Sequence, residues 1–329
     1  MVDLVVLTRN LYLGASIEPI VALTDPSQVP RAVAEAWARI DASRFPERAR
    51  AVAAEIARHR PHLVGLQEAW GFEVRQPGQP EAAPPLAAVD YLQILLDELG
   101  RQGGDYRAAS VAAGPAFAVP SATGHQIRAR DRDVVLSRAD VEVTAASGAR
   151  YEVAAAIRLG GAGAALESRR AWARVEVAVA GRRLRFVTTH LETPAFPAVQ
   201  AAQARELLEE HADGAWPTVL VGDFNSGPGD ASTAAYEQLL AAGFADTWAH
   251  MHPDDLGATC GQAESLRNPV SSLSARIDLV LTRGVAARVP RIRLVCRAAA
   301  RVGHRPEERT PSGLWPSDHA GMVASLSLE

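Results

Sequence analysis

Lysine is absent from this 329-residue chain, and cysteine is almost absent. All 34 basic residues are arginine, and we attribute this bias, together with the abundance of alanine, to a GC-rich genome. The two cysteines, Cys260 and Cys296, are too few for a framework of several disulfides. They permit one bond in an oxidising compartment, and two buried free thiols are the simpler expectation.

Long hydrophobic runs and an excess of positive charge are also missing. No stretch approaches the roughly 18 apolar residues of a membrane-spanning helix, so no transmembrane segment is predicted. Residues 2–6 have the pattern of a strand rather than of a signal peptide. The protein is therefore expected to be cytoplasmic unless a leader was removed from an exported precursor. A formal net charge of −4 argues against a nonspecific nucleic-acid binder.

Hydrophobic residues make up 48% of the chain, which is enough to bury a large core. Their spacing predicts helices over residues 30–40, 46–60, 87–100, 199–212 and 233–242, and strands over residues 2–8, 62–67, 133–137, 171–179, 184–189, 218–221, 276–281, 291–296 and 322–328. Strands outnumber helices, and antiparallel pairs dominate. We therefore expect an α/β fold in which two mostly antiparallel sheets pack face to face with helices outside, as one domain over residues 1–329.

Two segments interrupt this pattern. Four prolines lie within residues 71–85, so residues 71–130 are interpreted as a loop-rich excursion. The aromatic residues at its start, Trp70 and Phe72, are candidates for shaping substrate specificity. Residues 160–163 are rich in glycine, but a strand pattern rather than a helix follows them. A hairpin loop is therefore predicted there instead of a dinucleotide-binding loop.

Polar residues with ligand chemistry stand at three strand ends. Glu68 follows one predicted strand, Asp223 and Asn225 follow a second, and Asp318 and His319 precede the last. Hard divalent cations such as Mg²⁺ prefer carboxylate and amide oxygens. The sequence therefore predicts one metal site. Glu68 is the first choice of ligand, because an unpartnered carboxylate directly after a buried strand would be costly.

Two further patterns indicate how a water molecule and a phosphate would be handled. Asp223 and Asn225, at alternate positions, would point the same way, so that one activates a water and the other donates to a phosphate oxygen. A turn closed by the aspartate side chain explains these residues equally well. Asp278 lies within the predicted strand 276–281, where a buried charge needs a partner, and His319 is the candidate. Such a pair would keep the imidazole protonated near neutrality.

His190 and Asn10 complete the candidate set. His190 follows the strand at 184–189 and offers a second imidazole, with Asp133 and Glu192 as candidate partners. Asn10 follows the first strand and is placed to hold a metal ligand or a metal-bound water, with a strand-capping turn as the alternative. Six arginines between residues 291 and 309 precede the last of these strand ends. Contact with an anionic substrate and a solvated loop are both open interpretations of them.

These motifs, taken together and in chain order, resemble those of the endonuclease/exonuclease/phosphatase superfamily. They are Asn10, Gln67-Glu68, Thr189-His190-Leu191, Gly222-Asp223-Phe224-Asn225, Arg276-Ile277-Asp278 and Ser317-Asp318-His319. The superfamily includes deoxyribonuclease I, abasic-site endonucleases, bacterial sphingomyelinases and inositol polyphosphate 5-phosphatases. The resemblance covers residues 1–328. It implies a four-layered α/β sandwich that hydrolyses phosphoester bonds with Mg²⁺ or a similar ion.

The resemblance also assigns roles to the candidate residues. It implies Glu68 and Asn10 at the metal with Asp318 as a further metal-side acid, Asp223 and Asn225 at the attacking water and the phosphate, and Asp278 with His319 as a coupled pair. His190 matches an imidazole found in nucleases of the deoxyribonuclease I type and in sphingomyelinases. Abasic-site endonucleases have an amide there, so the resemblance favours the former groups.

The expected function is therefore a metal-dependent phosphoester hydrolase, foremost a phosphodiesterase that works by in-line attack of an activated water. Mg²⁺ is the expected cofactor, with Mn²⁺ or Ca²⁺ as alternatives. The expected partner is a phosphodiester, whether a small molecule, a lipid head group or a nucleic acid, and a monomer is expected. An endonuclease acting on DNA or RNA, a sphingomyelinase-like enzyme and an inositol-phosphatase-like enzyme stay open. A silent binding module is disfavoured, because no acidic or imidazole position is missing.

Overall fold

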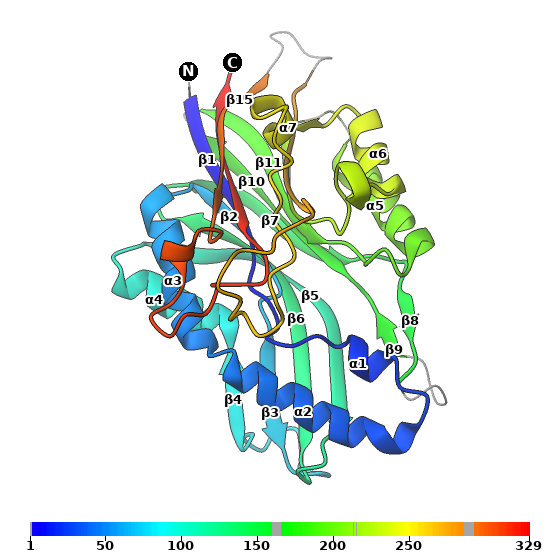
Figure 1. Ribbon diagram of the computed structural model, residues 1–329. Coiled ribbons are helices and arrows are strands. Elements are labelled where there is room, and N and C mark those ends of the chain that lie inside the picture. The colour runs from blue at the N-terminus through cyan, green and yellow to red at the C-terminus, as the bar shows by residue number, and fades with distance from the viewer. Residues whose placement is uncertain (1, 160–165, 180, 213, 215, 286–292) are drawn as a thin grey trace.

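Two large β-sheets packed face to face form the centre of the molecule, as a computed structural model shows (Figure 1). The structure describes residues 2–159, 166–179, 181–212, 214, 216–285 and 293–329. Among these residues, the first sheet runs in the order β15-β16-β1-β2-β6-β3-β4, with β5 also paired to β6. Its strands are β1 (Val2–Asn10), β2 (Leu63–Gln67), β3 (Gly71–Arg75), β4 (Ala87–Asp90), β5 (Tyr106–Pro120), β6 (Gln126–Arg138), β15 (Leu294–Val302) and β16 (Gly321–Leu328).

The second sheet runs in the order β13-β14-β12-β11-β10-β7. Its strands are β7 (Glu142–Arg150), β10 (Ala171–Val179), β11 (Arg182–His190), β12 (Thr218–Asp223), β13 (Ala245–Asp246) and β14 (Asp278–Arg283). A separate two-stranded sheet consists of β8 (Ala155–Ile157) and β9 (Leu166–Ser168). The hairpin predicted between residues 171 and 189 is formed by β10 and β11, which pair antiparallel.

Helices cover the outer faces of both sheets. Two flank the first sheet, α3 (Phe45–His59) and α4 (Tyr91–Arg101), while α5 (Pro197–His211) and α6 (Ala234–Ala241) cover the second (Figure 1). The other helices are α1 (Glu18–Val21), α2 (Val29–Ala42), α7 (Thr247–Met251) and the short 3-10 turns η1 (Pro26–Gln28), η2 (Gly229–Ala231) and η3 (Pro306–Glu308). Prolines in the first turns of α2, α3 and α5 suit the helix start, where no N–H is needed.

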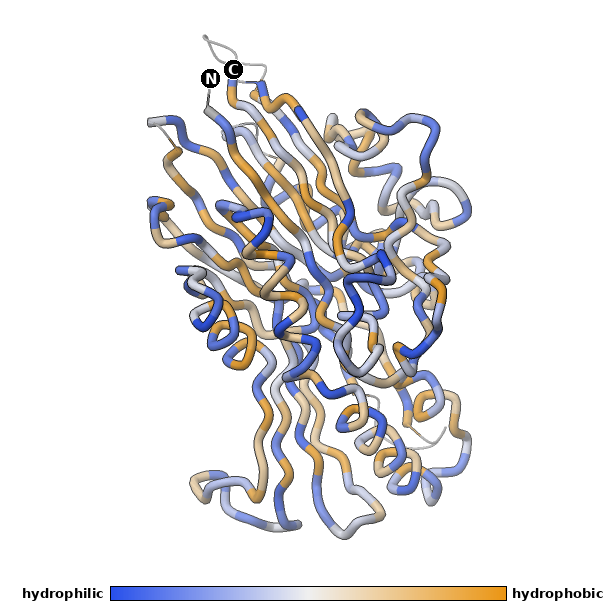
Figure 2. The backbone as a smooth tube through the Cα atoms, turned by 60° about the vertical axis from the view of Figure 1, so that its left-hand side comes forward, coloured by the Kyte–Doolittle hydropathy of each residue, from blue (hydrophilic) through white to orange (hydrophobic). Residues whose placement is uncertain are grey.

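The layers are held together by three apolar clusters. The middle cluster joins the inner faces of the sheets, with Leu4 and Val6 on one side and Val219 and Val280 on the other. The two outer clusters seat the helices on their sheets. Hydrophobic segments accordingly concentrate in the strands (Figure 2). The predicted four-layered α/β sandwich is therefore confirmed, with helices, sheet, sheet and helices in succession.

One parallel pair lies inside each sheet. The strand β1 is parallel to β2, and β11 is parallel to β12, whereas the other pairs among the described strands are antiparallel. The sheets approach very closely at Gly65 in β2. A Cβ atom there would lie 2.4 Å from Val221 Cγ2 and 2.6 Å from Thr188 Oγ1, both in the second sheet. This glycine therefore lets the carboxyl ends of the two parallel pairs meet.

The loop-rich excursion expected at residues 71–130 is wrong, because this segment contains four strands and a helix. Its strands β5 and β6 have 15 and 13 residues, and their lower ends project beyond the sandwich (Figures 1 and 2). The four prolines of residues 71–85 all lie in the turn between β3 and β4, so they break one hairpin loop rather than the segment. We call residues 71–90 and 115–130 the arm.

Two other boundaries differ from the prediction. The helix expected from residue 87 begins at Tyr91, because the Asp90 side chain accepts a hydrogen bond from the Gln93 N–H at 3.0 Å and caps it there. The strand expected at 291–296 is β15, which begins at Leu294 and continues to Val302. Residues 291–292, like the glycine-rich residues 160–163, lie outside the described residues.

Both cysteines are free and only partly buried, so the option of a bond between Cys260 and Cys296 is not realised in the structure. Among the described residues, none of the helices has the length and apolar character required to cross a membrane.

Candidate active site

The sequence-predicted residues meet at the carboxyl ends of the two parallel pairs. Asn10 at the end of β1 links the sheets: its amide nitrogen donates to Glu68 Oε1 and to Asp223 Oδ2, each at 3.1 Å. Its own Oδ1 accepts from the Tyr12 N–H at 2.8 Å, which is the strand-capping turn. Asn10 therefore forms the capping turn and also presents N–H groups to both carboxylates.

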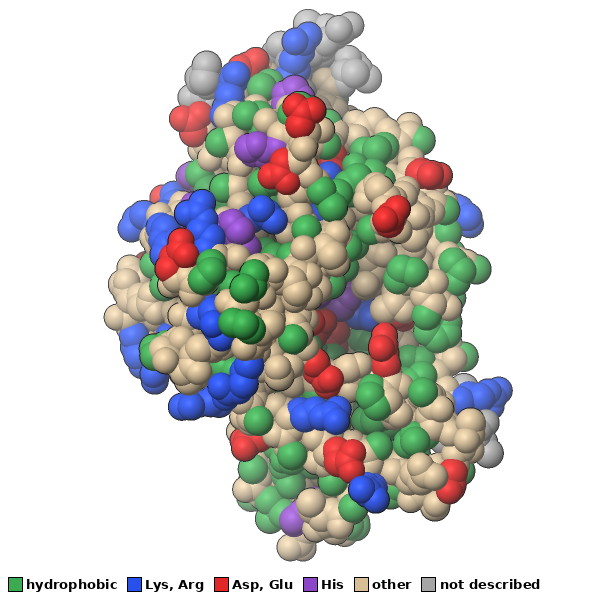
Figure 3. All heavy atoms as spheres, viewed as in Figure 1, with side chains coloured by type: hydrophobic (Ala, Val, Ile, Leu, Met, Phe, Trp, Pro, Cys, Tyr) green, Lys and Arg blue, Asp and Glu red, His purple; other side chains and the backbone are tan. Residues whose placement is uncertain are grey.

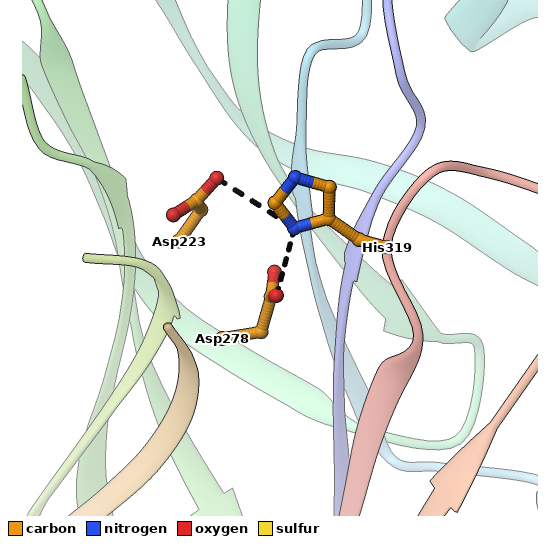
Figure 4. A group of neighbouring side chains, drawn as sticks. All are labelled: Asp223, Asp278 and His319. Atoms are coloured by element: carbon orange, nitrogen blue, oxygen red, sulfur yellow. Dashed lines mark hydrogen bonds and ion pairs between the residues drawn. The ribbon is translucent and has the colours of Figure 1, made fainter. Parts of the chain in front are cut away.

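Asp278 and His319 lie in direct contact. His319 Nδ1 is 2.8 Å from Asp278 Oδ2 and 3.9 Å from Asp223 Oδ2 (Figure 4). Asp278 is the first residue of β14, in register opposite Asp223, rather than a mid-strand residue as predicted. Buried Arg9 donates to the His319 carbonyl oxygen and pairs with Glu55 at 3.0 Å. The backbone that carries the imidazole is thus fixed from the first sheet.

His190 has other partners than those predicted. Its Nε2 lies 3.5 Å from Asp223 Oδ2, and its Nδ1 lies 3.0 Å from Arg170 Nη1. A guanidinium only donates hydrogen bonds, so Nδ1 accepts and the ring proton sits on Nε2. The expected pairing with Asp133 or Glu192 is wrong. Glu192 instead accepts from Arg170 at 3.2 Å, and Arg170 lies between this carboxylate and the His190 ring.

Asn225 lies beyond the end of β12 and not on it. Its φ of +48° is left-handed, so the strand alternation that would have aligned it with Asp223 does not apply. Its N–H donates to Asp223 Oδ1 at 2.9 Å, which closes the aspartate turn, and its amide nitrogen donates to the Leu191 carbonyl at 2.9 Å. One N–H of that amide is left for another acceptor.

Glu68 and Asp318 face the same side of the site. Glu68 Oε2 accepts from the Leu13 N–H at 2.6 Å and from Trp70 Nε1 at 3.3 Å. Asp318 Oδ1 lies 3.9 Å from His319 Nε2, and its side chain keeps 23% of its exposure. Of the six described non-glycine residues with positive φ, three border the site: Tyr12, Glu68 and Asn225. Such conformations cost free energy and cluster where function requires them.

Burial and charge shift the proton affinities of these groups. Burial, then the charge of Asp278, raises the pKa of Asp223 to about 7. Burial raises the pKa of Asp318 to about 6, with His319 opposing and Glu68 adding to the shift. For His319 burial acts to lower the pKa, but the carboxylates of Asp278 and Asp318 raise it well above its ordinary value. For His190 burial, then the Arg170 charge, lowers the pKa well below its ordinary value.

The donor set suits a divalent cation. Carboxylates from distant segments repel one another here, and the mutual repulsion of Glu68 and Asp318 is part of the raised pKa of Asp318. A bound cation would relieve this repulsion. Oxygens of Asp223 and Asp278 and a nitrogen of His319 also lie within 4.8 Å of one another, a geometry that can hold an ion. Because Asp278 and His319 already share a hydrogen bond, the oxygens of Glu68 and Asp318 suit a hard cation better.

Sequence reasoning missed Arg170, Arg48 and Arg9. Buried Arg48 donates to the carbonyl oxygens of Leu11 at 2.7 Å and of Pro316 at 3.0 Å. It therefore connects the segment that follows β1 to the segment that precedes Asp318. No local pattern distinguishes these arginines from the others in the chain. Their only signal is that they are cations in otherwise apolar or helical segments that the fold buries.

Three of the arginines between residues 291 and 309 have side-chain partners of their own. Arg297 pairs with Glu329, Arg301 donates to the Ala258 carbonyl at 2.8 Å, and Arg309 lies over the Trp315 ring. These contacts favour a structural role over contact with substrate.

Comparison with known proteins agrees with this fold. The family model described as "Endonuclease/Exonuclease/phosphatase family" matches residues 34–319. No curated protein sequence matched the chain. Solved structures share the fold: the endonuclease/exonuclease/phosphatase from Beutenbergia cavernae is 22% identical with a TM-score of 0.57, covering 100% of this chain and 72% of that one. That from Bacteroides vulgatus is 16% identical with a TM-score of 0.58 over 100% of both chains.

A third similar structure is TDP2 from D. rerio in complex with a single-strand DNA product, 15% identical with a TM-score of 0.56 over 99% of both chains. The family match spans most of the chain, and the fold agrees over its whole length. Divalent metals and phosphoester hydrolysis are the general chemistry of this family. The chain belongs to the endonuclease/exonuclease/phosphatase family.

Proposed function

We propose that the protein is a metal-dependent phosphodiesterase in which Asp223 activates the attacking water. The observation that carries this proposal is the position of Asp223, a buried carboxylate held by Asn10 and Asn225 between two imidazoles. Its pKa of about 7 is matched to accepting a proton near neutral pH.

Glu68 and Asp318 would hold the cation, and Asn10 would orient Glu68 through its 3.1 Å hydrogen bond. Mg²⁺ is the proposed ion, with Mn²⁺ and Ca²⁺ as alternatives, because the donors are hard oxygens. When bound, such an ion polarises a phosphoryl oxygen and stabilises the leaving oxygen.

The remaining residues bind the phosphate and fix its orientation. His319, held charged by Asp278, donates to a phosphoryl oxygen that gains charge in the transition state. His190 donates its Nε2–H as a neutral imidazole, and the free N–H of Asn225 adds a third donor. Asp223 accepts the proton of the water on the opposite side from the leaving oxygen, as in-line attack requires.

A nucleic acid is the second candidate substrate, since the D. rerio TDP2 structure contains a single-strand DNA product. A small phosphodiester is preferred here because the formal net charge is −4 and Arg170, the arginine in contact with His190, is already paired with Glu192. A nuclease would lose affinity steeply as salt rises, whereas hydrolysis of a small diester would not.

The test is a metal screen against bis(p-nitrophenyl) phosphate, p-nitrophenyl phosphate, plasmid DNA and sphingomyelin. We expect hydrolysis of the aryl diester that a chelator abolishes and Mg²⁺ restores. Glu68→Gln should raise the metal concentration required by roughly a hundredfold. Glu81→Gln is the matched control, because the Glu81 side chain is 85% exposed. Equal metal requirement in both variants, or turnover that survives the chelator, would refute the proposal.

The catalytic groups come from both sheets, so we further propose that residues 1–329 act as one catalytic domain. All the contacts described above are made within one chain, and a monomer is the proposed active species. Size-exclusion chromatography with light scattering, run at assay concentration, tests this state. Activity that appears only when the chain dimerises would contradict it.

A further inference from the structure

An apolar cavity of about 100 Å³ lies where α1 and α2 cross the arm (Figure 1). Each described residue that lines it has an apolar or aromatic side chain. The lining residues used below are Leu13, Val33, Ala36, Trp37, Trp70 and Phe117. Water finds no polar partner among these side chains, and apolar cavities of roughly this class bind groups the size of benzene.

This cavity opens toward the catalytic groups through a second one. The second cavity has a volume of about 260 Å³ and shares five lining residues with the first: Ile17, Val21, Trp70, Phe117 and Ile157. Its polar end is lined by Arg170 and Glu192, and Arg170 is the residue that bonds His190. In Figure 3 hydrophobic side chains lie below the hollow that contains acidic and histidine side chains. The apolar cavity therefore continues into a second one that ends beside Arg170, the partner of His190.

Two residues join the apolar cavity directly to Glu68. Leu13 and Trp70 both line it, and the same residues donate the hydrogen bonds of 2.6 and 3.3 Å to Glu68 Oε2. Ile17 at the shared rim is 40% exposed, so the entrance is reachable from solvent. A phosphate bound beside Glu68 thus needs only a short linker to place an apolar group in the cavity.

We infer that the substrate is an amphipathic phosphoester whose short alkyl or aryl group fills the cavity lined by Ala36, Trp37, Trp70 and Phe117. This inference rests on the proposed function for the phosphate end of the substrate. The apolar group is chosen over a polar one because a sugar or base would leave its hydrogen-bonding groups unpaired there. A chain longer than the cavity would have to leave it through the rim at Ile17.

The first experiment is a series of p-nitrophenyl phosphodiesters that carry a methyl, ethyl, propyl, butyl or octyl group. The value of kcat/KM should rise roughly fourfold for each added methylene until the cavity is full, and then level off. Equal kcat/KM for the methyl and butyl esters would overturn the inference.

A matched pair of variants on α2 locates the effect. Ala36→Leu fills the cavity, and Ala38→Leu makes the same change at an exposed position of the same helix. The ratio of kcat/KM for butyl over methyl ester should fall at least tenfold in Ala36→Leu and stay unchanged in Ala38→Leu. An unchanged ratio in folded Ala36→Leu would overturn the assignment.

Should that variant not fold, Phe117→Ala provides a second test because it enlarges the cavity. The alkyl chain length that gives the highest kcat/KM should then increase, and an unchanged chain length would overturn the assignment.

Binding separates this inference from the proposed function. Calorimetry with methylphosphonate and butylphosphonate in the presence of Mg²⁺ requires no turnover. Tighter binding of butylphosphonate by a protein that hydrolyses none of the esters would support the cavity and refute the phosphodiesterase. Hydrolysis of all the esters, with equal binding of both phosphonates, would refute the cavity and leave the phosphodiesterase in place.

Discussion

The two imidazoles beside Asp223 have opposite surroundings. His319 Nδ1 contacts a carboxylate, that of Asp278, at 2.8 Å, whereas His190 Nδ1 contacts a guanidinium, that of Arg170, at 3.0 Å. Both rings are buried, and burial alone would lower both pKa values. The carboxylate reverses the shift for one ring, and the guanidinium reinforces it for the other.

This difference teaches that residue type does not decide the role of a histidine in this site. Near neutral pH His319 is a charged donor and His190 a neutral one, so a phosphate would receive one full positive charge and one dipole. Asp223 lies between them and keeps its capacity to accept a proton. The predictions below test each part of this asymmetry.

The largest loss of activity is expected from a change at Asp223, which lies between the two imidazoles. Asp223→Asn removes the proton acceptor while keeping its size, and kcat should fall by roughly a thousandfold, within the range for loss of a general base. Asp230→Asn is the control, since Asp230 is exposed in the turn that follows β12. Steady-state assays with saturating metal measure both. Near-normal turnover in Asp223→Asn would remove Asp223 from the mechanism.

The second prediction concerns the charged imidazole, that of His319, and its partner Asp278. Asp278→Asn removes the anion that stabilises the imidazolium, so the pKa of His319 should fall. The alkaline limb of the pH–activity profile should move to lower pH with it. The value of kcat at pH 8 should fall roughly a hundredfold. Ring proton shifts followed by NMR against pH report the pKa directly. An unmoved His319 resonance would contradict the pairing.

Changes beside the neutral imidazole, that of His190, should cause a smaller loss of activity. Arg170→Gln removes a positive charge from Nδ1 of His190, so the pKa of His190 should rise while kcat/KM falls roughly tenfold. Because this variant leaves Glu192 unpaired, thermal unfolding must show that it folds. Arg169→Gln, next to it but with a partly exposed side chain, is the control. Loss of activity without a change in the His190 titration would indicate a structural role only.

The smallest effect concerns stability. The folded pKa values of about 7 for Asp223 and about 6 for Asp318 lie above the ordinary 3.8, so unfolding releases protons between about pH 4 and pH 7. These two groups therefore make the metal-free protein less stable as pH rises through that window. Mg²⁺ competes with those protons and should raise Tm by a few degrees more at pH 8 than at pH 5. An equal Mg²⁺ shift at both values would contradict this linkage.

Much of the architecture could be predicted because the signals are local. Buried runs such as those ending at Glu68 and Asp223 are continuous in sequence, and the period of the hydrophobic pattern distinguishes strands from helices. The arm was missed because the four prolines in the turn between β3 and β4 hid the short strands on either side of it. In β5 and in the first half of β6, small and charged residues interrupt the alternation of large apolar residues, so only residues 133–137 of β6 were predicted as a strand.

The candidate residues could be found, but not all of their partners. Asp278 and His319 were paired by a general argument, since a buried charge needs a counter-charge. The contact of Arg170 with His190 depends on the register of the β10–β11 hairpin, which pairs Trp172 with Thr189. A slip by one residue would turn Arg170 to the other face, and the alternating pattern did not fix that register. The φ of Asn225 likewise follows from the turn after β12 rather than from its residue type.

Gly65 has a consequence for catalysis although it carries no chemistry. Asn10, Glu68 and His319 come from one sheet, while Asp223 and His190 come from the other. The spacing between the sheets therefore also sets the distance from the proposed cation ligands to the proposed proton acceptor. A methyl group at Gly65 would act as a wedge, with no room before Val221 and Thr188. Each sheet could keep its own hydrogen bonds while the distances between site residues on the two sheets changed. The packing of the two sheets against each other at Gly65 therefore sets those distances.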